Sequence, residues 1–339
     1  MPYTPMMQQY LETKENYKDY ILFYRLGDFY EMFFDDALKV SRELELTLTG
    51  KDCGMDERAP MCGIPYHAAD QYIARLVKKG YQVAICEQLE DPATAKGIVK
   101  RDVVRIITPG TITEGSLLVE GKNNYLCSVF IDGLSAGFAV TDISTAEIYA
   151  TEFCDGEGDL SQKLINEMGI YAPSEVMTNL PEENCEALRD YVRIRLGANF
   201  HADEKNRFRT DLPALKNQFG EGFLYQNGLR EDSPMLPALS ALLSYLAETQ
   251  KTDISYINKL NCYSNEQFLS IDINTRRNLE LCETMRSKEK KGSLLGILDK
   301  TKTAMGARLL RKQIEQPLLS CNRIERRQNA VRGLFDDMI

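Results

Sequence analysis

The chain has 339 residues, of which 43% are hydrophobic and 27% charged, and its formal net charge is -9. This composition is ordinary for a globular protein and excludes a disordered tail, a collagen-like fibre and a membrane protein. The first residues carry no apolar run of a secretory signal, so a cytoplasmic location is expected. Nine singly placed cysteines and two histidines argue against a disulfide framework and a zinc site.

Charge and pattern together predict three domains, at 1–115, 116–249 and 250–339. The first segment holds 14 basic and 18 acidic residues, the second 10 basic and 21 acidic, and the third 17 basic and 11 acidic. Their net charges are therefore -4, -11 and +6. Basic character is therefore confined to the last quarter of the chain. Bulk charge alone does not indicate nucleic-acid binding by the first two segments.

The first segment alternates strand and helix patterns and is predicted to be a mixed α/β domain. Thr4 and Pro5 are typical of a helix N-cap and first helical position. Apolar residues recur at helical spacing over 29–44, whereas glycines and prolines predict a loop over 49–65. The expected elements are helices at 5–18, 29–44 and 67–79 and strands at 20–26, 81–86 and 103–108.

The later segments differ in pattern. The second begins with three strand-like runs, and helices and strands then alternate, with one strand expected at 192–195. This order resembles the RNase H-like α/β arrangement, which by itself implies no activity. The third segment is predicted to be all-α, and because the chain stops within a helical pattern, it is expected to be the N-terminal part of a longer protein. Its expected helices are at 274–285, 293–299, 304–315 and 322–335.

No catalytic motif is present in the sequence. It contains no G-x-x-x-x-G-K-[ST], G-x-G-x-x-G or G-x-S-x-G pattern. Asp132 and Asp142 lie near strands that carry metal-binding carboxylates in RNase H-type nucleases. No full carboxylate set accompanies them, so a structural or turn role is favoured. The chain is predicted not to be an enzyme and to hold no cofactor or metal.

One segment, RLGDFYEMFF at 25–34, combines aromatic side chains with a carboxylate just after a predicted strand. By itself, its helical spacing favours a core role for Phe29 and Phe33. In that interpretation Asp28 is a helix N-cap and Glu31 is its capping-box partner.

Together with other motifs, this segment resembles the bacterial MutS family of DNA mismatch-repair proteins. The similarity covers essentially the whole chain, is very specific over 4–111 and is weaker over 120–250. It implies a mismatch-recognition domain, a connector domain and the start of a helical core domain, in that order. Besides the segment above, the matching motifs are TPMMQQY at 4–10, MCGIPYHA at 61–68, VAICEQ at 83–88, DPATAKG at 91–97, VRIITPGT at 104–111, IDINTRRNLE at 271–280 and AMGARLL at 304–310.

The resemblance implies a reading role for Phe29 and Glu31. In this family the phenylalanine wedges into the minor groove and stacks on a mispaired or unpaired base, and the glutamate hydrogen-bonds that base. Opening a base step costs a few kcal/mol in rough terms, and a mismatch is easier to open. Tyr30 is expected to face the interior. Lys51 and Arg58 are candidates for contact with the DNA backbone.

The resemblance also implies partners and cofactors. The chain would bind mismatched double-stranded DNA and initiate mismatch repair, in the bacterial cytoplasm at the nucleoid. Its connector would contact a MutL-type partner. ATP and Mg²⁺ would belong to the full-length protein, whose nucleotide-binding domain and homodimer contacts are expected beyond residue 339. This chain alone is expected to be a monomer.

Two alternatives stay open from the sequence. One is a metal-dependent nuclease built on the RNase H-like middle domain. The other is a MutS relative that binds branched DNA without reading mismatches. Relatives of that kind usually lack the Phe-x-Glu pair, which this chain has at 29–31.

Overall fold

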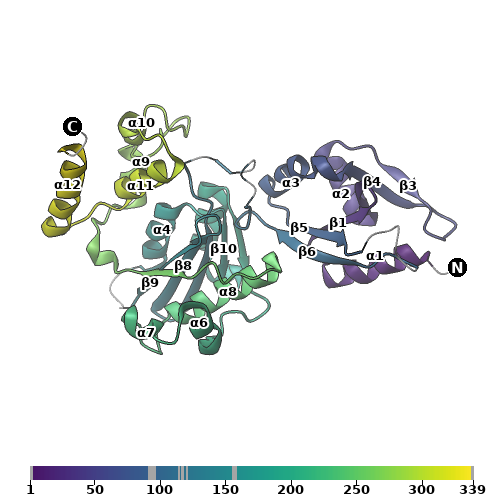
Figure 1. Ribbon diagram of the computed structural model, residues 1–339, viewed down its shortest axis with the longest axis horizontal. Coiled ribbons are helices and arrows are strands. Elements are labelled where there is room, and N and C mark those ends of the chain that lie inside the picture. Colours follow the sequence, from purple (N-terminus) through teal and green to yellow (C-terminus); the bar gives the residue numbers. More distant parts are fainter. Residues whose placement is uncertain are drawn as a thin grey trace. The chain divides into compact units, whose positions relative to one another are not determined.

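The computed structural model describes residues 3–90, 97–113, 115, 118–119, 121–154 and 159–336. It divides into two compact units, one formed by Met1–Leu118 with Leu242–Ile257 and the other by Val119–Ala241 with Asn258–Ile339. Each unit contains one six-stranded mixed sheet with helices packed on it (Figure 1). The predicted α/β class is confirmed, and the predicted boundaries of three domains stay predictions. Most of the DPATAKG motif lies outside the described residues.

The sheet of the first unit has the strand order β3-β4-β2-β1-β5-β6, and only β1 and β5 pair in parallel. Figure 1 shows α1 on one side of this sheet and α2 and α3 on the other. The strands are β1 (Ile21–Leu26), β2 (Phe29–Phe33), β3 (Thr49–Lys51), β4 (Ala59–Pro65), β5 (Val83–Gln88) and β6 (Arg101–Ile107). The helices are α1 (Pro5–Asn16), α2 (Phe34–Leu44), the short η1 (Tyr66–Ala68) and α3 (Ala69–Lys78).

Alternation along the strands assigns each side chain of this sheet to one of two cores. Phe23 on β1 and Met32 on β2 belong to the core under α2 and α3. Tyr24 and Phe33, one residue further along the same strands, belong to the core under α1. The two faces of β2 therefore pack against different helices, and the candidate site lies on the face that packs against α1.

The predicted helix over 29–44 is wrong in its first part. Residues 29–33 form β2, and α2 begins only at Phe34, whose backbone φ is +50°. Gly27, at φ +58°, begins a two-residue turn that joins β1 to β2, and such turns favour glycine at this position. Asp28 is therefore not a helix N-cap, and Glu31 is not its capping-box partner.

Two more predictions of local structure are wrong. The predicted loop over 49–65 contains β3 and β4, because these residues pair across the sheet despite their glycines and prolines. The predicted strand over 192–195 is part of a π-helical turn, η3 (Tyr191–Leu196), which ends at Gly197 with φ +64°. The strand follows it as β11 (Asn199–Ala202).

The sheet of the second unit has the order β11-β10-β7-β8-β9-β12. Strands β7, β8 and β9 are consecutive and antiparallel, as predicted, while β10, β11 and β12 join by parallel pairing. The remaining strands are β7 (Leu126–Asp132), β8 (Ser135–Asp142), β9 (Glu147–Phe153), β10 (Glu175–Thr178) and β12 (Lys259–Cys262). Helices in this part of the chain include α4 (Leu160–Tyr171), η2 (Glu182–Asn184), α5 (Glu186–Asp190), α6 (Leu212–Phe219), α7 (Phe223–Gln226) and α8 (Met235–Gln250).

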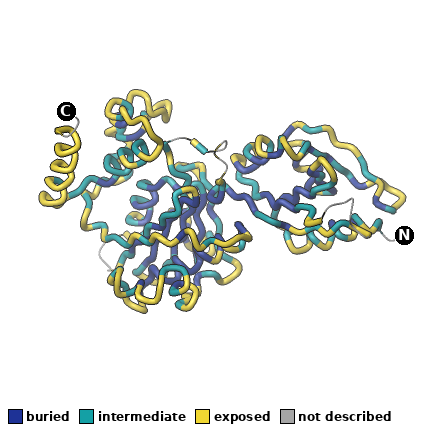
Figure 2. The backbone as a smooth tube through the Cα atoms, in the orientation of Figure 1, coloured by how far each residue is buried: buried dark blue, intermediate teal, exposed yellow. Residues whose placement is uncertain are grey.

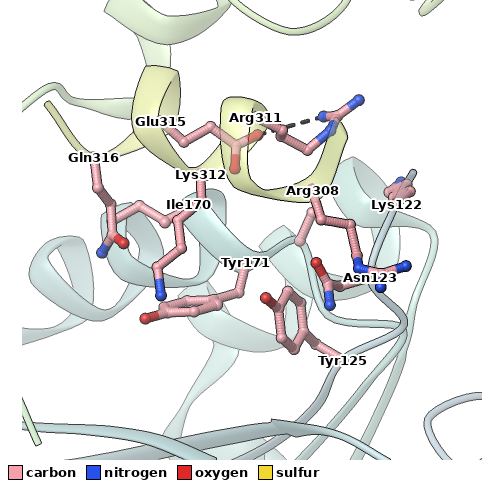
Figure 3. Close-up of a pocket in the computed structure, with 11 residues that line it drawn as sticks. Lys122, Asn123, Tyr125, Ile170, Tyr171, Arg308, Arg311, Lys312, Glu315 and Gln316 are labelled. Atoms are coloured by element: carbon pink, nitrogen blue, oxygen red, sulfur yellow. Dashed lines mark hydrogen bonds and ion pairs between the residues drawn. The ribbon is translucent and has the colours of Figure 1, made fainter. Parts of the chain in front are cut away.

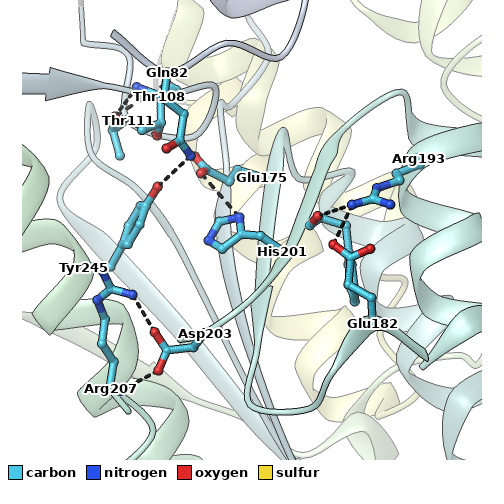
Figure 4. Close-up of polar contacts among 11 residues, drawn as sticks. Gln82, Thr108, Thr111, Glu175, Glu182, Arg193, His201, Asp203, Arg207 and Tyr245 are labelled. Carbon is cyan, nitrogen blue, oxygen red and sulfur yellow. Dashed lines mark hydrogen bonds and ion pairs between the residues drawn. The ribbon is translucent and has the colours of Figure 1, made fainter. Parts of the chain in front are cut away.

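Both faces of the second sheet are covered. Apolar residues of α4 and α5 pack on one face. On the other face, Ser128 of β7 donates a hydrogen bond to the carbonyl of Ala238 in α8 at 2.9 Å. An ion pair stabilises the segment that follows β11, where the Arg207 guanidinium lies 2.5 Å from the Asp203 carboxylate (Figure 4).

The expectation of an all-α segment from residue 250 onward is not confirmed. The alternating residues Lys259–Cys262 form β12, which pairs in parallel with β9. Four helices follow, and the first is shorter than predicted: α9 (Ile273–Asn278), α10 (Leu294–Leu298), α11 (Ala304–Glu315) and α12 (Cys321–Asp336). Figure 2 shows the contrast between the buried strands and α12, which is exposed along its length.

Among the described residues, no helix is long and apolar enough to cross a membrane.

Candidate nucleic-acid interface

Strand β2 presents one partly uncovered face. Its alternation places Phe29, Glu31 and Phe33 on one side and Tyr30 on the other. Phe33 is fully buried beneath Tyr10 of α1, with ring centroids 4.8 Å apart, whereas Phe29 is 46% exposed. The helix therefore covers the Phe33 end of this face and leaves the Phe29 end open. A core role for Phe29 is wrong, and the expectation that Tyr30 faces the interior is confirmed.

Gly63 keeps the surface beside Phe29 and Glu31 flat. It pairs with Glu31 across β4 and β2. A Cβ atom added at Gly63 would lie 3.5 Å from Cγ of Glu31 and 3.9 Å from Cδ1 of Phe29. Sequence reasoning missed this residue. The available signal was an isolated glycine in an apolar run, which often marks close approach of another group.

Glu31 and Lys51 form an ion pair in this structure. The Lys51 ammonium lies 2.5 Å from Oε2 of Glu31, and the two side chains are 31% and 15% exposed. The same ammonium lies 5.7 Å from the ring centroid of Phe33. The sequence assigned Lys51 and Glu31 to separate contacts with DNA, but strand pairing from β2 through β4 to β3 brings them together.

Arg58, the second candidate for a backbone contact, immediately precedes β4 and is exposed. The pairing of Lys51 with Ala59 places Arg58 at the same end of the β3–β4 hairpin as Lys51. Its Cβ atom would lie 3.1 Å from a Cβ atom added at Gly50, so the hairpin backbone is close beneath it. Arg58 is therefore an exposed cation at the end of β4 away from Phe29, whose partner on β4 is Pro65.

A polar cluster holds β2 from its other side. The Tyr30 hydroxyl donates a hydrogen bond to Oε1 of Glu87, and Arg25 lies 3.7 Å from the same oxygen. The Arg25 guanidinium also lies 3.7 Å from the ring centroid of Tyr66. Burial and the Glu87 carboxylate raise the pKa of Tyr30, so its hydroxyl stays a donor at neutral pH. No sequence pattern indicated this cluster, which fixes the strand that carries Phe29.

The geometry indicates what this face can bind. An exposed aromatic ring on a rigid strand can stack on another flat π-system. The adjacent carboxylate can accept a hydrogen bond from a donor on the same ligand. Its charge is balanced by the Lys51 ammonium, so the pair adds no net charge to the surface.

In the second unit, the two carboxylates of the nuclease alternative lie far apart. Asp132 pairs with Ser135 at one end of the β7–β8 hairpin, and Asp142 lies seven residues along β8 at the other end. Seven residues of strand span about 23 Å, so the two cannot share a metal ion. Asp142 is buried and accepts hydrogen bonds from Asn123 at 2.7 Å and from the Ser144 backbone at 2.9 Å. The described residues contain no metal-binding group of three His, Cys, Asp or Glu side chains.

Comparison with known proteins supports the whole order of domains. Residues 4–116 match MutS domain I, residues 124–258 match MutS domain II and residues 274–339 match MutS domain III. The chain belongs to the MutS family.

Several curated relatives are similar over nearly the whole chain. The DNA mismatch repair protein MutS of Ruminiclostridium cellulolyticum is 53% identical over 98% of the chain, and that of Alkaliphilus oremlandii is 50% identical over 99%. The MutS protein of Clostridium novyi is 51% identical over 100% of the chain. The chain spans 36–38% of the length of these relatives.

Proposed function

We propose that this chain recognises mismatched or unpaired bases in duplex DNA, as the first step of DNA mismatch repair. Phe29 would stack on the mispaired base from the minor groove, and Glu31 would hydrogen-bond that base. The observation that carries this proposal is the exposed Phe29 ring at the open end of a sheet face, with Glu31 on the same face. The relatives are named DNA mismatch repair proteins, which agrees with it.

The energetics favour recognition of a mispair by the ease with which the DNA deforms there. An inserted ring must unstack a base step, which costs a few kcal/mol in rough terms, and a mispair lowers that cost. The contacts of Tyr30 with Glu87 hold β2 in place on its other face, so Phe29 loses little conformational entropy when its ring stacks. This mechanism needs no sequence-specific contact, so it can serve many different mispairs.

The ion pair modifies the role expected of Lys51. A bare carboxylate on a DNA-binding face is repelled by phosphates. With Lys51 at 2.5 Å, the carboxylate of Glu31 approaches DNA with its charge balanced. We assign Lys51 to this balancing role, and Arg58 to the backbone contact.

The finer assignments of the second and third segments are part of the same proposal. Three consecutive antiparallel strands followed by two parallel ones support an RNase H-like connector in the second unit. Its net charge of -11 over 116–249 favours a protein partner of the MutL type over DNA. Hydrolysis of ATP with Mg²⁺ and homodimerisation would belong to the longer relatives.

The test compares binding of a matched duplex, the same duplex with one G·T mispair and a four-way junction, by fluorescence anisotropy at low and moderate salt. We expect weak, salt-sensitive binding with a preference for the mispair. Phe29→Ala should remove that preference, since base–aromatic stacking is worth about 1–3 kcal/mol.

Phe335→Ala is the matched control, because Phe335 is 74% exposed on α12. It should leave the preference unchanged. A mispair preference that survives Phe29→Ala would contradict the reading role. Stronger binding of the junction than of the mispair would instead favour the branched-DNA alternative, and Mg²⁺-dependent cleavage lost on Asp132→Asn would favour the nuclease.

A further inference from the structure

A small cavity lies beneath α11 in the second unit. Helix α11 packs on the segment that precedes β7, where a Cβ atom added at Gly121 would lie 3.1 Å from Cβ of Ala307. The cavity measures about 30 Å³ and lies between α11, this segment and the end of α4 (Figure 3). Tyr125 and Tyr171 form its aromatic wall, with ring centroids 5.2 Å apart in an edge-to-face arrangement.

The lining of this cavity is strongly cationic. Arg308, Arg311, Lys312 and Glu315 lie on one face of α11, because their spacing follows the helical repeat. Lys122 approaches from the segment before β7. Four cations therefore face the cavity with one carboxylate among them.

The single carboxylate does not balance these charges. Glu315 lies 3.4 Å from Arg311. Within the described part of the chain, no carboxylate lies within ion-pair distance of Lys122, Arg308 or Lys312. The lining thus keeps a net charge of about +3 at neutral pH.

Two of these cations are partly buried, which costs free energy of solvation. The Lys312 ammonium lies 3.5 Å from the ring centroid of Tyr149, and burial lowers the pKa of Lys312 to about 8. Glu147 opposes this shift from a greater distance, while it accepts a hydrogen bond from the Tyr149 hydroxyl at 2.5 Å. Nε of Arg311 is buried without a hydrogen-bond partner. Unsatisfied buried donors of this kind destabilise a protein unless a ligand completes them.

We propose that this cavity binds a phosphate group. Its size admits about two water molecules, which fits one compact anionic group and excludes a length of polymer backbone. The Arg308 guanidinium and the Lys312 ammonium both line this cavity and suit a doubly charged tetrahedral anion, because each can donate a charge-assisted hydrogen bond to a separate oxygen. The group could arrive as inorganic phosphate or as the terminal phosphate of a nucleotide. This site is separate from the Phe29 face, and neither proposal depends on the other.

The test is isothermal titration calorimetry of the purified chain with inorganic phosphate, ATP and adenosine in chloride buffer. We expect saturable binding of one phosphate per chain. Arg308→Ala and Lys312→Met should each weaken it by about tenfold, the loss expected for one charge-assisted hydrogen bond. Tighter binding of ATP than of phosphate, with no binding of adenosine, would identify a nucleotide as the source, whereas equal affinities would identify free phosphate.

Matched controls carry the same substitutions on exposed cations away from the cavity, Arg326→Ala and Lys302→Met. These should leave the affinity unchanged. Thermal melting checks that every variant is folded, and Arg308→Gln replaces Arg308→Ala if the latter is not. No saturable binding, or an affinity that the cavity variants leave unchanged or that the controls lower equally, would overturn the proposal.

Discussion

The two sheets of this protein differ in how completely helices cover them. In the second unit both faces are covered, and at Gly137 the chain approaches so closely that an added Cβ atom would lie 1.8 Å from the carbonyl oxygen of Pro234. In the first unit, α1 covers Phe33 but leaves Phe29 open on the same face. A strand can therefore supply both a core residue and a recognition residue when the covering helix ends between them.

The largest expected effect separates the two phenylalanines of β2. Phe33→Ala should lower the free energy of unfolding by about 3–5 kcal/mol, because it leaves a cavity beneath Tyr10. Phe29→Ala should lower it by less than about 1 kcal/mol, since its ring is 46% exposed. Urea denaturation followed by circular dichroism measures both. Comparable losses for the two variants would show that the Phe29 end is covered as well.

A glycine in each sheet provides the next test. Gly137→Ala should cost about 3 kcal/mol, because its Cβ would overlap the backbone of Pro234 and no side chain can move aside. Gly63→Ala should cost less than about 1 kcal/mol, because its nearest neighbours would lie at ordinary contact distances of 3.4 Å and more. Thermal melting of both variants tests directly whether the second sheet is more closely covered than the first. A well-tolerated Gly137→Ala would contradict the close packing of the second sheet.

These contrasts also show how far the sequence predicts the fold. The three strands β7, β8 and β9 were predictable because turn residues separate clear strand patterns. The nature of residues 29–33 was not, because Phe29, Met32 and Phe33 also match the spacing of an amphipathic helix. The glycine turn at Gly27 and pairing with two neighbouring strands decided in favour of a strand.

The candidate site was predictable only in part. Phe29 and Glu31 were identified through resemblance to a family, and their shared exposed face now follows from strand alternation. The Glu31–Lys51 pair could not be predicted, because it depends on the register of β2, β4 and β3 across 20 residues of sequence. Turn geometry fixes the register within a hairpin, but α2 separates β2 from β3 and β4 in the sequence, so no turn fixes this one.

A buried carboxyl group in the second unit predicts a pH-dependent stability. Glu167 on α4 is 4% exposed and accepts a hydrogen bond from Tyr263 at 2.5 Å, and burial raises its pKa to about 7. The folded state therefore binds this proton more tightly than the unfolded chain does. Its contribution to stability is present at low pH and is lost as the pH rises from about 4.5 towards 7.

Glu167→Gln should abolish that loss. The variant should match the parent near pH 5 and exceed its free energy of unfolding by about 2 kcal/mol at pH 8. Urea denaturation across this range measures the difference. Glu31→Gln is the control from the open face, where the side chain is 15% exposed and paired. A parent whose stability relative to Glu167→Gln does not change with pH would show that Glu167 is ionised throughout.

The smallest expected effect concerns the ion pair on the open face. Lys51→Met should change stability by less than about 1 kcal/mol, because partly exposed pairs contribute little. Its effect on DNA should be clearer. If Lys51 balances the charge of Glu31, its removal exposes a carboxylate that repels phosphates, so Lys51→Met should weaken binding of matched and mispaired duplexes alike. Glu31→Gln removes that repulsion, and the double variant should regain the lost affinity.

A double-mutant cycle on matched duplex tests this assignment of Lys51. Charge balancing predicts that the double variant binds as tightly as the parent, because both carry no net charge at this pair, and that Lys51→Met alone loses on the order of 1 kcal/mol in binding free energy. A direct contact of Lys51 with a phosphate predicts instead that the double variant stays weaker than the parent, since Glu31→Gln cannot restore that contact. It also predicts a shallower dependence of affinity on salt, since one fewer counterion is released. A weakened double variant with a reduced salt slope would therefore show that Lys51 contacts the DNA backbone, while full recovery with an unchanged slope would show that it acts on Glu31.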